Sequence, residues 1–451
     1  MLCDAEIVLR GGKVALPGCN HFEETDIAVE KGVIVDIGGA FSGQTEVDLR
    51  GLIVLPGGID PHVHFNDPGF TSRENFYTGS CAAASGGITT VIDMPCTSIP
   101  AVTNADNLKH KLDLVSKVSI VDFGFFGGVC AQMFDNDFEA DMESIAHDVL
   151  GFKAYFLSGM KSFGQLDHFQ YERVLKKARK LNLPVLLHAE DPSYVNSATD
   201  FYRKRGSSPK DYYFSRPEIA EVLAIESAVQ LAKKTASKLH IVHISSSKSA
   251  KLVQDEHISC ETAPHYLAFD LDDFMRIGSP LKVNPPIKSK GNSEALWEML
   301  SGGMIDFVAS DHAPCTTDEK NTGSIWTDYS GIPGVGTLLP YMFSEGFTKS
   351  RVSLSQLTRS TSQSPAERYG ISDRKGSIEV GKDADFAVFD PVKKWRVIGA
   401  DSLSKGKITP FEGMEFAGQV VKTIRRGELI YDSQKGIVTQ PGTGVFIRKR
   451  L

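Results

Sequence analysis

The chain has 451 residues, of which 41% are hydrophobic and 23% are charged, and its formal net charge is -7. This length and composition predict a globular protein with one large and one smaller domain, or two or three domains of ordinary size. The negative net charge gives no support to nucleic acid or an anionic membrane as the main partner. No apolar run approaches the roughly 20 residues of a membrane-spanning helix, and Asp4 and Glu6 interrupt any signal peptide.

The cysteines are odd in number and widely scattered, and no two of them form a CxxC pair. This pattern favours free thiols in a reducing compartment over disulfides or a cysteine-rich zinc site. We therefore expect a cytoplasmic protein with these free thiols: Cys3, Cys19, Cys81, Cys96, Cys130, Cys260 and Cys315.

Both ends of the chain predict short β-strands separated by turns. Residues 1–55 include AEIVLRGGKVAL and TDIAVEKGVIVDIGG, in which glycines mark the hairpin turns. Residues 376–451 have the same character, as in GSIEVGKDADFAVFD and FAGQVVKTIRRGELIYD. Each end is too short to form a core alone, so we predict that the two pair into one small discontinuous β-sandwich domain.

Residues 56–375 differ, because short apolar runs alternate there with helical segments. Runs such as GITTVIDMP, LPVLLHAE and LHIVHIS are apolar on both faces, which is typical of parallel strands covered on both sides. Between such runs, segments such as YERVLKKARKL repeat apolar residues at the three- and four-residue spacing of helices. About eight strands over about 320 residues predict an α/β fold, a TIM-like (β/α)8 barrel. An open, doubly wound sheet is the alternative.

Side chains that bind metals follow several of the predicted strands. His62 and His64 alternate in DPHVHF, so both imidazoles leave the strand on the same side. In a (β/α)8 barrel the carboxyl ends of all strands meet at one mouth. One such residue alone is more often structural, but six on five strand ends predict a metal site. The six are His62, His64, Lys153, His188, His243 and Asp311.

Lys153 is the most informative member of this set. An ammonium between Phe152 and Ala154 in a buried strand is costly, and a neighbouring cation would increase the cost. A salt bridge would relieve it. So would reaction of the neutral amine with carbon dioxide, which gives a carbamate whose two oxygens can bridge two metals. Asp311 ends its strand beside His312, a place that suits a metal ligand able to accept a proton.

The motifs DPHVHFNDPG, GFKAYF, LLHAED, HIVHISS, CETAPHYL and ALWEMLSGGMIDFVASDHAPC resemble those of cyclic amidohydrolases of the amidohydrolase superfamily. This group includes dihydroorotases, allantoinases and hydantoinases, and the resemblance spans essentially the whole chain. It implies two divalent metal ions, with zinc expected, bridged by Lys153 as N6-carboxylysine. The implied ligands are His62, His64 and Asp311 for one metal and His188 and His243 for the other.

The resemblance also implies a mechanism. Two metals that share a water lower its pKa and yield hydroxide near neutral pH, which attacks the carbonyl of a cyclic amide or ureide. Asp311 then acts first as a base and afterwards as an acid toward the leaving ring nitrogen. Some superfamily members keep the barrel, lose the metals and serve as scaffolds. Here every ligand position holds a residue that can bind a metal, which favours an enzyme.

Asn66 bears on the substrate. Dihydroorotases would place an arginine there to grip a carboxylate, with asparagine at Cys96 and histidine at Cys315. None of the three is present, and burying an unpaired carboxylate costs on the order of several kcal/mol. Asn66, SDHAPC, SRPEIAE and ALWEML are more similar to allantoinases, whose neutral substrate suits an amide that donates and accepts. KVNPP and TPFEG favour dihydroorotase, which stays as an alternative with hydantoinase and dihydropyrimidinase.

The expected partner is therefore a small cyclic ureide or amide, with no nucleic acid and no membrane. The resemblance also implies a homo-oligomer, a tetramer or a dimer. The loop from Gly331 to Gly336 is a further candidate contact for the substrate. The side chains predicted to touch the substrate are Asn66, Asn284, His265 and Cys315.

Overall fold

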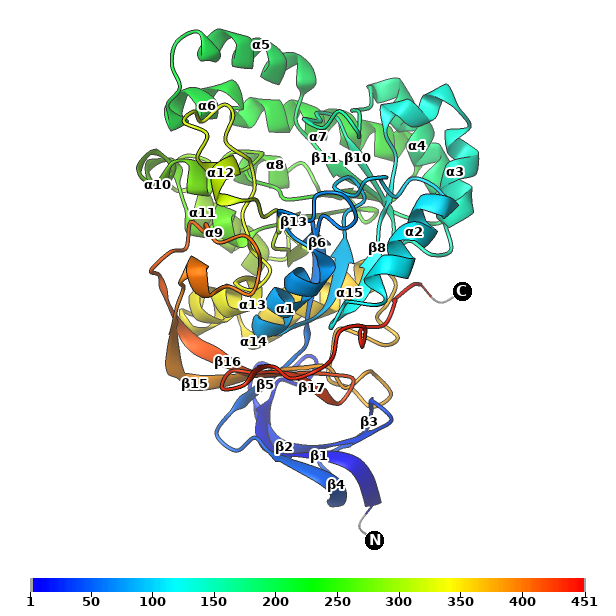
Figure 1. Ribbon diagram of the computed structural model, residues 1–451, viewed down its shortest axis with the longest axis vertical. Coiled ribbons are helices and arrows are strands. Elements are labelled where there is room, and N and C mark those ends of the chain that lie inside the picture. The colour runs from blue at the N-terminus through cyan, green and yellow to red at the C-terminus, as the bar shows by residue number, and fades with distance from the viewer. Residues whose placement is uncertain (1–2, 450–451) are drawn as a thin grey trace.

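Parallel strands and helices alternate through the middle of the chain in the computed structural model, which describes residues 3–449 (Figure 1). Six parallel strands form one sheet in the order β14-β13-β12-β11-β10-β9, and three form a second in the order β6-β7-β8. Their bounds are β6 Gly58–Val63, β7 Ile88–Asp93, β8 Asp122–Phe125, β9 Gly127–Gly128, β10 Phe152–Tyr155, β11 Val185–His188, β12 Leu239–Ile241, β13 Ile258–Thr262 and β14 Phe307–Val308.

The two sheets adjoin at both ends without forming one continuous ladder. Strand β8 runs into β9 through Phe126, so the chain changes neighbours there from β7 to β10. At the other junction, β14 ends at Val308, and beyond it an isolated bridge joins Val63 to His312. The predicted α/β class with parallel strands is confirmed. The closed ladder of a barrel is not formed, because β14 is short and the chain turns at Asp311, whose φ is 47°.

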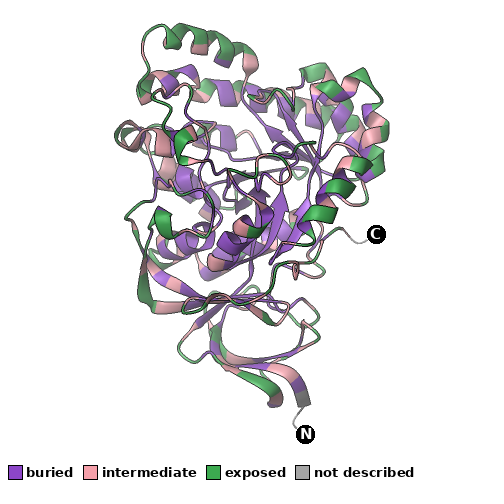
Figure 2. Ribbon diagram, viewed as in Figure 1, coloured by how far each residue is buried: buried purple, intermediate pink, exposed green. Residues whose placement is uncertain are grey.

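Helices cover the outer faces of these sheets, and Figure 2 shows the strands buried while the outward helix faces are exposed. Two π-helices, η3 (Met342–Thr348) and η4 (Arg359–Gln363), follow the last parallel strand. The α-helices are α1 Phe76–Ser85, α2 Ala105–Val115, α3 Phe138–Ile145, α4 His168–Lys180, α5 Pro192–Arg203, α6 Pro209–Ser215, α7 Glu218–Thr235, α8 Ser247–Ala250, α9 Pro264–Ala268, α10 Leu271–Ile277, α11 Asn292–Ser301, α12 Thr317–Lys320, α13 Leu338–Tyr341, α14 Leu354–Thr358 and α15 Ser364–Arg368.

Helix α4 illustrates why these segments are helical. Asp167 caps it by accepting from the backbone N–H of Gln170, and the Gln170 side chain accepts from the backbone N–H of Asp167. Basic residues fill its last turn, where they oppose the helix dipole. Its buried residues recur at three- and four-residue spacing, which makes one face apolar: Tyr171, Val174, Leu175 and Ala178.

Strands from both ends of the chain form one nine-stranded sheet, drawn below the helices in Figure 1. The two ends meet where β5 pairs antiparallel with β15, with Ile53 opposite Phe389. The ladder is continuous, and side chains from both ends share one hydrophobic cluster. That the two ends build one small β-sandwich domain stays a prediction. The order is β18-β17-β16-β15-β5-β1-β2-β3 with β4 beside β1, and the bounds are β1 Cys3–Val14, β2 Glu23–Glu30, β3 Val33–Ile37, β4 Phe41–Asp48, β5 Ile53–Pro56, β15 Phe386–Arg396, β16 Glu415–Arg425, β17 Glu428–Asp432 and β18 Gly436–Ile437.

Two expectations concern the chain as a whole. Among the described residues, no helix is both long and apolar enough to cross a membrane. The free-thiol prediction for Cys3 lies outside the described side chains. The other cysteines are free thiols in the part of the chain that the structure describes: Cys19, Cys81, Cys96, Cys130, Cys260 and Cys315.

A buried ion cluster ties the smaller parallel sheet to the nine-stranded sheet. Lys375 Nζ lies 2.6 Å from Asp122 Oδ2, 2.9 Å from Asp383 Oδ2 and 2.7 Å from Asp385 Oδ2. Arg426 Nε lies 3.2 Å from Asp122 Oδ2 on the other side. Burial alone would lower the pKa of Lys375, but the three carboxylates raise it above its usual value. The ammonium is therefore a permanent counter-charge.

Replacing this ammonium should destabilise the fold. Lys375→Met removes the cation that three buried carboxylates share, of which Asp122 keeps Arg426, and we expect a loss of about 3–5 kcal/mol in the free energy of unfolding. Urea denaturation measures it. Lys394→Met is the matched control, because Lys394 pairs with Glu415 at an exposed site, where an ion pair contributes little. Equal midpoints for the two variants would show that the cluster does not hold the two sheets together.

Candidate metal and active site

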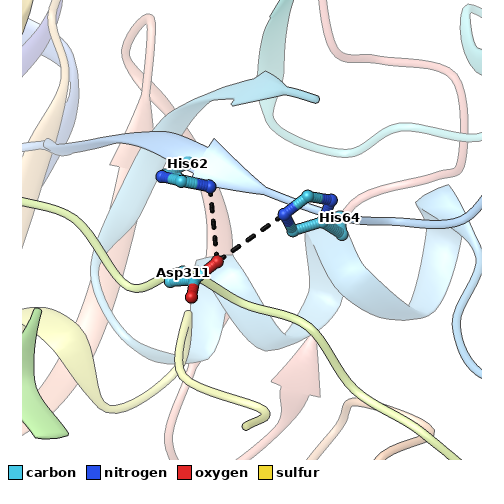
Figure 3. A group of neighbouring side chains, drawn as sticks. All are labelled: His62, His64 and Asp311. Carbon is cyan, nitrogen blue, oxygen red and sulfur yellow. Dashed lines mark ion pairs between the residues drawn. The ribbon is translucent and has the colours of Figure 1, made fainter. Parts of the chain in front are cut away.

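Two histidines at the carboxyl end of β6 face an aspartate that follows β14. His62 Nε2 lies 3.3 Å and His64 Nε2 lies 3.6 Å from Asp311 Oδ1. Figure 3 shows both rings beside the carboxylate. One potential ligand atom from each of the three side chains lies within 4.8 Å of the others. This spacing suits one shared cation with nitrogen and oxygen ligands.

Backbone hydrogen bonds bring these three side chains together. His312 N donates to His62 O at 3.2 Å, and His64 N donates to His312 O at 2.8 Å. The residue before His312 is Asp311, which is thereby held beside β6. Burial would raise the pKa of Asp311, but the imidazoles of His62, His64 and His243 lower it well below its usual range. Asp311 is therefore an ionised carboxylate.

A second pair of histidines lies beside the first. His188 ends β11 and His243 follows β12, and His188 Nδ1 lies 2.9 Å from His243 Nε2. The ring centroids of His62 and His243 are 5.4 Å apart, so the two pairs form one cluster. Burial lowers the pKa of both His188 and His243, and a neutral imidazole is the form that binds a metal. His243 also has a φ of 41°, which its surroundings must enforce.

Lys153 lies on β10 within reach of the same cluster. Its side chain is fully buried, and Nζ has no hydrogen-bond partner among the described residues. Nζ lies 4.9 Å from the centroid of the Tyr155 ring. Burial lowers the pKa of Lys153 to about 8, although Cys96, Glu261 and Asp311 oppose the shift. The lowered pKa increases the share of neutral amine near physiological pH, and the neutral amine is the nucleophile that attacks carbon dioxide.

Two buried carboxylates behind the histidines were not singled out from the sequence. Glu261 on β13 contacts His62 Nδ1 through Oε1, and Glu190 Oε2 lies 2.9 Å from His188 Nε2. Each accepts from the ring nitrogen that points away from the cluster, which fixes the tautomer of its histidine. Both residues stand in motifs quoted above, CETAPHYL and LLHAED. A carboxylate within a fully buried strand was the signal that could have identified Glu261.

A cavity of about 310 Å³ opens at this cluster. Asn284 lines it as predicted, and so does Gly331 from the predicted loop. Tyr212 donates to Asn284 Oδ1, and its hydroxyl lies 3.2 Å from Ser330 Oγ, so this wall is internally hydrogen-bonded. The other polar or large side chains that line the cavity include Thr97, Tyr155, Leu157, Met160, Arg216 and Tyr329.

Three predicted substrate contacts are not part of the wall of this cavity, and their contact with the substrate stays a prediction. Asn66, His265 and Cys315 are all buried, and none is among the residues that line this cavity. Asn66 has a φ of 60°, and neither polar atom of its amide has a hydrogen-bond partner among the described residues. His265 Nε2 is likewise unpartnered. The sequence places all three residues near the ends of predicted strands.

Residues 53–430 match the sequence model of the Amidohydrolase family, and the chain therefore belongs to this family. The allantoinase of Rubrobacter xylanophilus is 36% identical to it, over 98% of this chain and 97% of the relative. The allantoinase of Enterococcus faecalis is 35% identical, over 98% of this chain and 99% of the relative. Among solved structures, the L-hydantoinase (dihydropyrimidinase) of Arthrobacter aurescens superposes with a TM-score of 0.94 at 28% identity, covering 99% of this chain and 100% of that one.

These comparisons confirm the predicted class of enzyme. The chain is a hydrolase of the kind that acts on cyclic amides, as the motifs indicated. Members of its family generally depend on two metal ions. In this chain the cluster of His62, His64 and Asp311 has the donor atoms and the spacing for one of them.

Metal analysis of histidine variants tests the cluster directly. We expect protein purified without chelator to carry two equivalents of divalent metal. His62→Asn and His188→Asn should each lower this content by about one equivalent or more, because a lost ligand weakens binding by orders of magnitude. His257→Asn, at an exposed histidine, should leave the content unchanged. Two equivalents retained in both cluster variants would contradict the assignment; plasma emission spectrometry measures the content.

Proposed function

We propose that this chain opens the ring amide of a neutral cyclic ureide and that the ureide is allantoin, which yields allantoate. The allantoinases among its relatives, similar over nearly their whole length, support this substrate. The motif SRPEIAE also supports it, because Arg216 of that motif lines the cavity.

The charge balance of the cavity is the observation that carries the proposal. Arg216 is the only lysine or arginine among the described residues that line it. Its Nη1 lies 2.5 Å from Glu190 Oε2, so its charge is already paired. A dihydroorotate carboxylate would meet no unpaired cationic side chain, and its burial would cost on the order of several kcal/mol. A neutral ureide does not incur this cost.

The donor set fits two divalent metals. His62, His64 and Asp311 offer three ligand atoms close together, and His188 Nδ1 and His243 Nε2 lie 2.9 Å apart beside them. Lys153 Nζ has no hydrogen-bond partner among the described residues. We propose zinc, held by these residues with Lys153 as N6-carboxylysine between the two ions. Such ions would supply the Lewis acidity that polarises a carbonyl and acidifies a water.

The protein's own groups then have distinct tasks. The Asp311 carboxylate accepts a proton from the attacking water and returns it to the ring nitrogen that leaves. The Tyr155 hydroxyl, which lines the cavity 3.0 Å from Cys96 Sγ, can donate to the carbonyl oxygen as negative charge develops there. Asn284 and Arg216 border the space left for the rest of the ureide.

The architecture is also part of the proposal. We propose that the two parallel sheets are the two arcs of one (β/α)8 barrel spanning residues 56–375. The continuity of β8 with β9 and the hydrogen bonds of His312 with β6 support it. The nine-stranded sheet, built from residues 1–55 and 376–451, would be the second domain.

A panel of substrates tests the proposed reaction. Metal-replete protein should open allantoin with a higher kcat/KM than hydantoin, dihydrouracil or dihydroorotate, each followed by chromatography of the ring-opened product. The second candidate is a hydantoinase or dihydropyrimidinase, because the solved L-hydantoinase has nearly the same fold. Preference for hydantoin or dihydrouracil would support it. Turnover of dihydroorotate alone would contradict the argument from charge balance.

Lys153→Ala tests the carbamate. We expect activity on allantoin to fall about 10³-fold or more, because the bridging anion is lost. A short carboxylic acid such as propionate, added at millimolar to molar concentration, should restore part of the activity by occupying the vacated space. The same acid should not activate the wild type. Full activity in the variant would remove the carbamate from the proposal.

The homo-oligomer and the cytoplasmic location stay predictions. Sedimentation equilibrium of the purified protein tests the first. A mass of two or four chains would support it, and a mass of one chain would contradict it.

A further inference from the structure

His312 has a central place behind the proposed base. It is fully buried and follows Asp311 directly. Its backbone lies between those of His62 and His64, through the two hydrogen bonds at 3.2 and 2.8 Å described above. The location of His312 therefore decides how far Asp311 stands from the two histidines.

The His312 imidazole is held from both sides. Nδ1 accepts from the backbone N–H groups of Gly334 at 3.1 Å and Val335 at 3.2 Å. Because two donors face Nδ1, the ring proton is on Nε2. That nitrogen lies 3.3 Å from Glu74 Oε2 and donates to it. The imidazole thus connects a buried carboxylate to the loop that begins at Asp311.

Glu74 accepts hydrogen bonds from the helix that follows it and from two distant segments of the chain. It precedes α1, is fully buried, and accepts from the Thr78 hydroxyl on that helix. Ser404 Oγ donates to Glu74 Oε2, and Lys405 N lies 3.3 Å from the same oxygen. Burial alone would raise the pKa of Glu74, but the hydrogen bonds that it accepts from His312, Ser404 and Thr78 lower it. The side chain is an ionised acceptor that His312 alone does not satisfy.

Asp311 needs such support because its backbone is strained. A φ of 47° is unusual for a residue with a side chain and costs on the order of 1–3 kcal/mol unless the surroundings enforce it. Without a fixed His312, the loop could relax and carry the carboxylate away from His62 and His64. The proposed proton transfer depends on that placement.

We infer that Glu74 is a positioning residue of this enzyme, which holds Asp311 in place through the imidazole of His312. The inference rests on the proposed function, because Asp311 has a task only if the chain catalyses hydrolysis. Glu74 is fully buried and does not line the cavity, so its role is to position other groups. The alternative is that Glu74 merely anchors the segment of Ser404 and Lys405 to the rest of the protein.

Glu74→Gln, Glu74→Asp and Ser404→Ala separate these roles. Glu74→Gln keeps the shape and removes the charge that orients His312; we expect kcat on allantoin to fall about 10- to 100-fold, with KM changed less than about twofold. Glu74→Asp should recover part of the loss. Ser404→Ala removes one donor and leaves the contact with His312, so its kcat should stay within about twofold of wild type.

Two measurements do not depend on turnover. Competition with a chromogenic zinc chelator should show about tenfold weaker zinc binding in Glu74→Gln than in Ser404→Ala, since Asp311 fits the cation less well. Thermal melting should show a similar loss of stability in both variants. In a His312→Asn background, Glu74→Gln should change kcat less than about twofold, because the two residues act as one unit.

The results that would overturn the role of Glu74 differ from those that would overturn the proposed function. If the wild type opens no cyclic ureide or amide, the proposed function fails and the positioning role falls with it. If the wild type is active and Glu74→Gln equals Ser404→Ala in kcat and zinc affinity, Glu74 is only an anchor and the inference is overturned. Full additivity of Glu74→Gln with His312→Asn would overturn it as well.

Discussion

The pair of backbone hydrogen bonds between His312 and the His62–His64 segment is the interaction on which the site depends. It joins the chain beyond β14 to β6, so it links the edges of the two parallel sheets. It also sets Asp311 against both imidazoles. Main-chain atoms make both hydrogen bonds, so the bonds do not depend on which side chains are present. The position of Asp311 beside the two imidazoles therefore exists before any ligand binds. The side chains then need only to have the right chemistry at the ends of the strands.

Three of the buried histidines each contact a buried glutamate. His62 contacts Glu261, His188 contacts Glu190, and His312 contacts Glu74. Each carboxylate is buried and costly unless it is hydrogen-bonded, and each histidine needs one nitrogen fixed so that the other has a defined role. The pairs satisfy both needs together. A further charge lies behind one of them, where Arg216 pairs with Glu190.

The sequence predicts the side chains that could bind metal better than it predicts the residues that hold them in place. Short apolar runs that contain a histidine or lysine predict buried strands and converging ligands, as His188 at the end of β11 and Lys153 within β10 illustrate. Glu74 and Ser404 are 330 residues apart, and no local pattern relates them. The direction of Asn66 depends on a left-handed backbone that only tertiary contacts impose. The break between the parallel sheets has the same origin, because it follows from where β14 ends.

The pairing of β5 with β15 has a consequence for biogenesis. About 330 residues separate the end of β5 from the start of β15, and at about 5–20 residues per second the ribosome needs roughly 15–70 s to make them. During that interval one edge of β5 (Ile53–Pro56), all of it apolar, has no β15 to pair with. Unprotected edges of this kind recruit other chains. The nascent polypeptide must therefore be shielded, by its own folding middle or by a chaperone, until its last strands emerge.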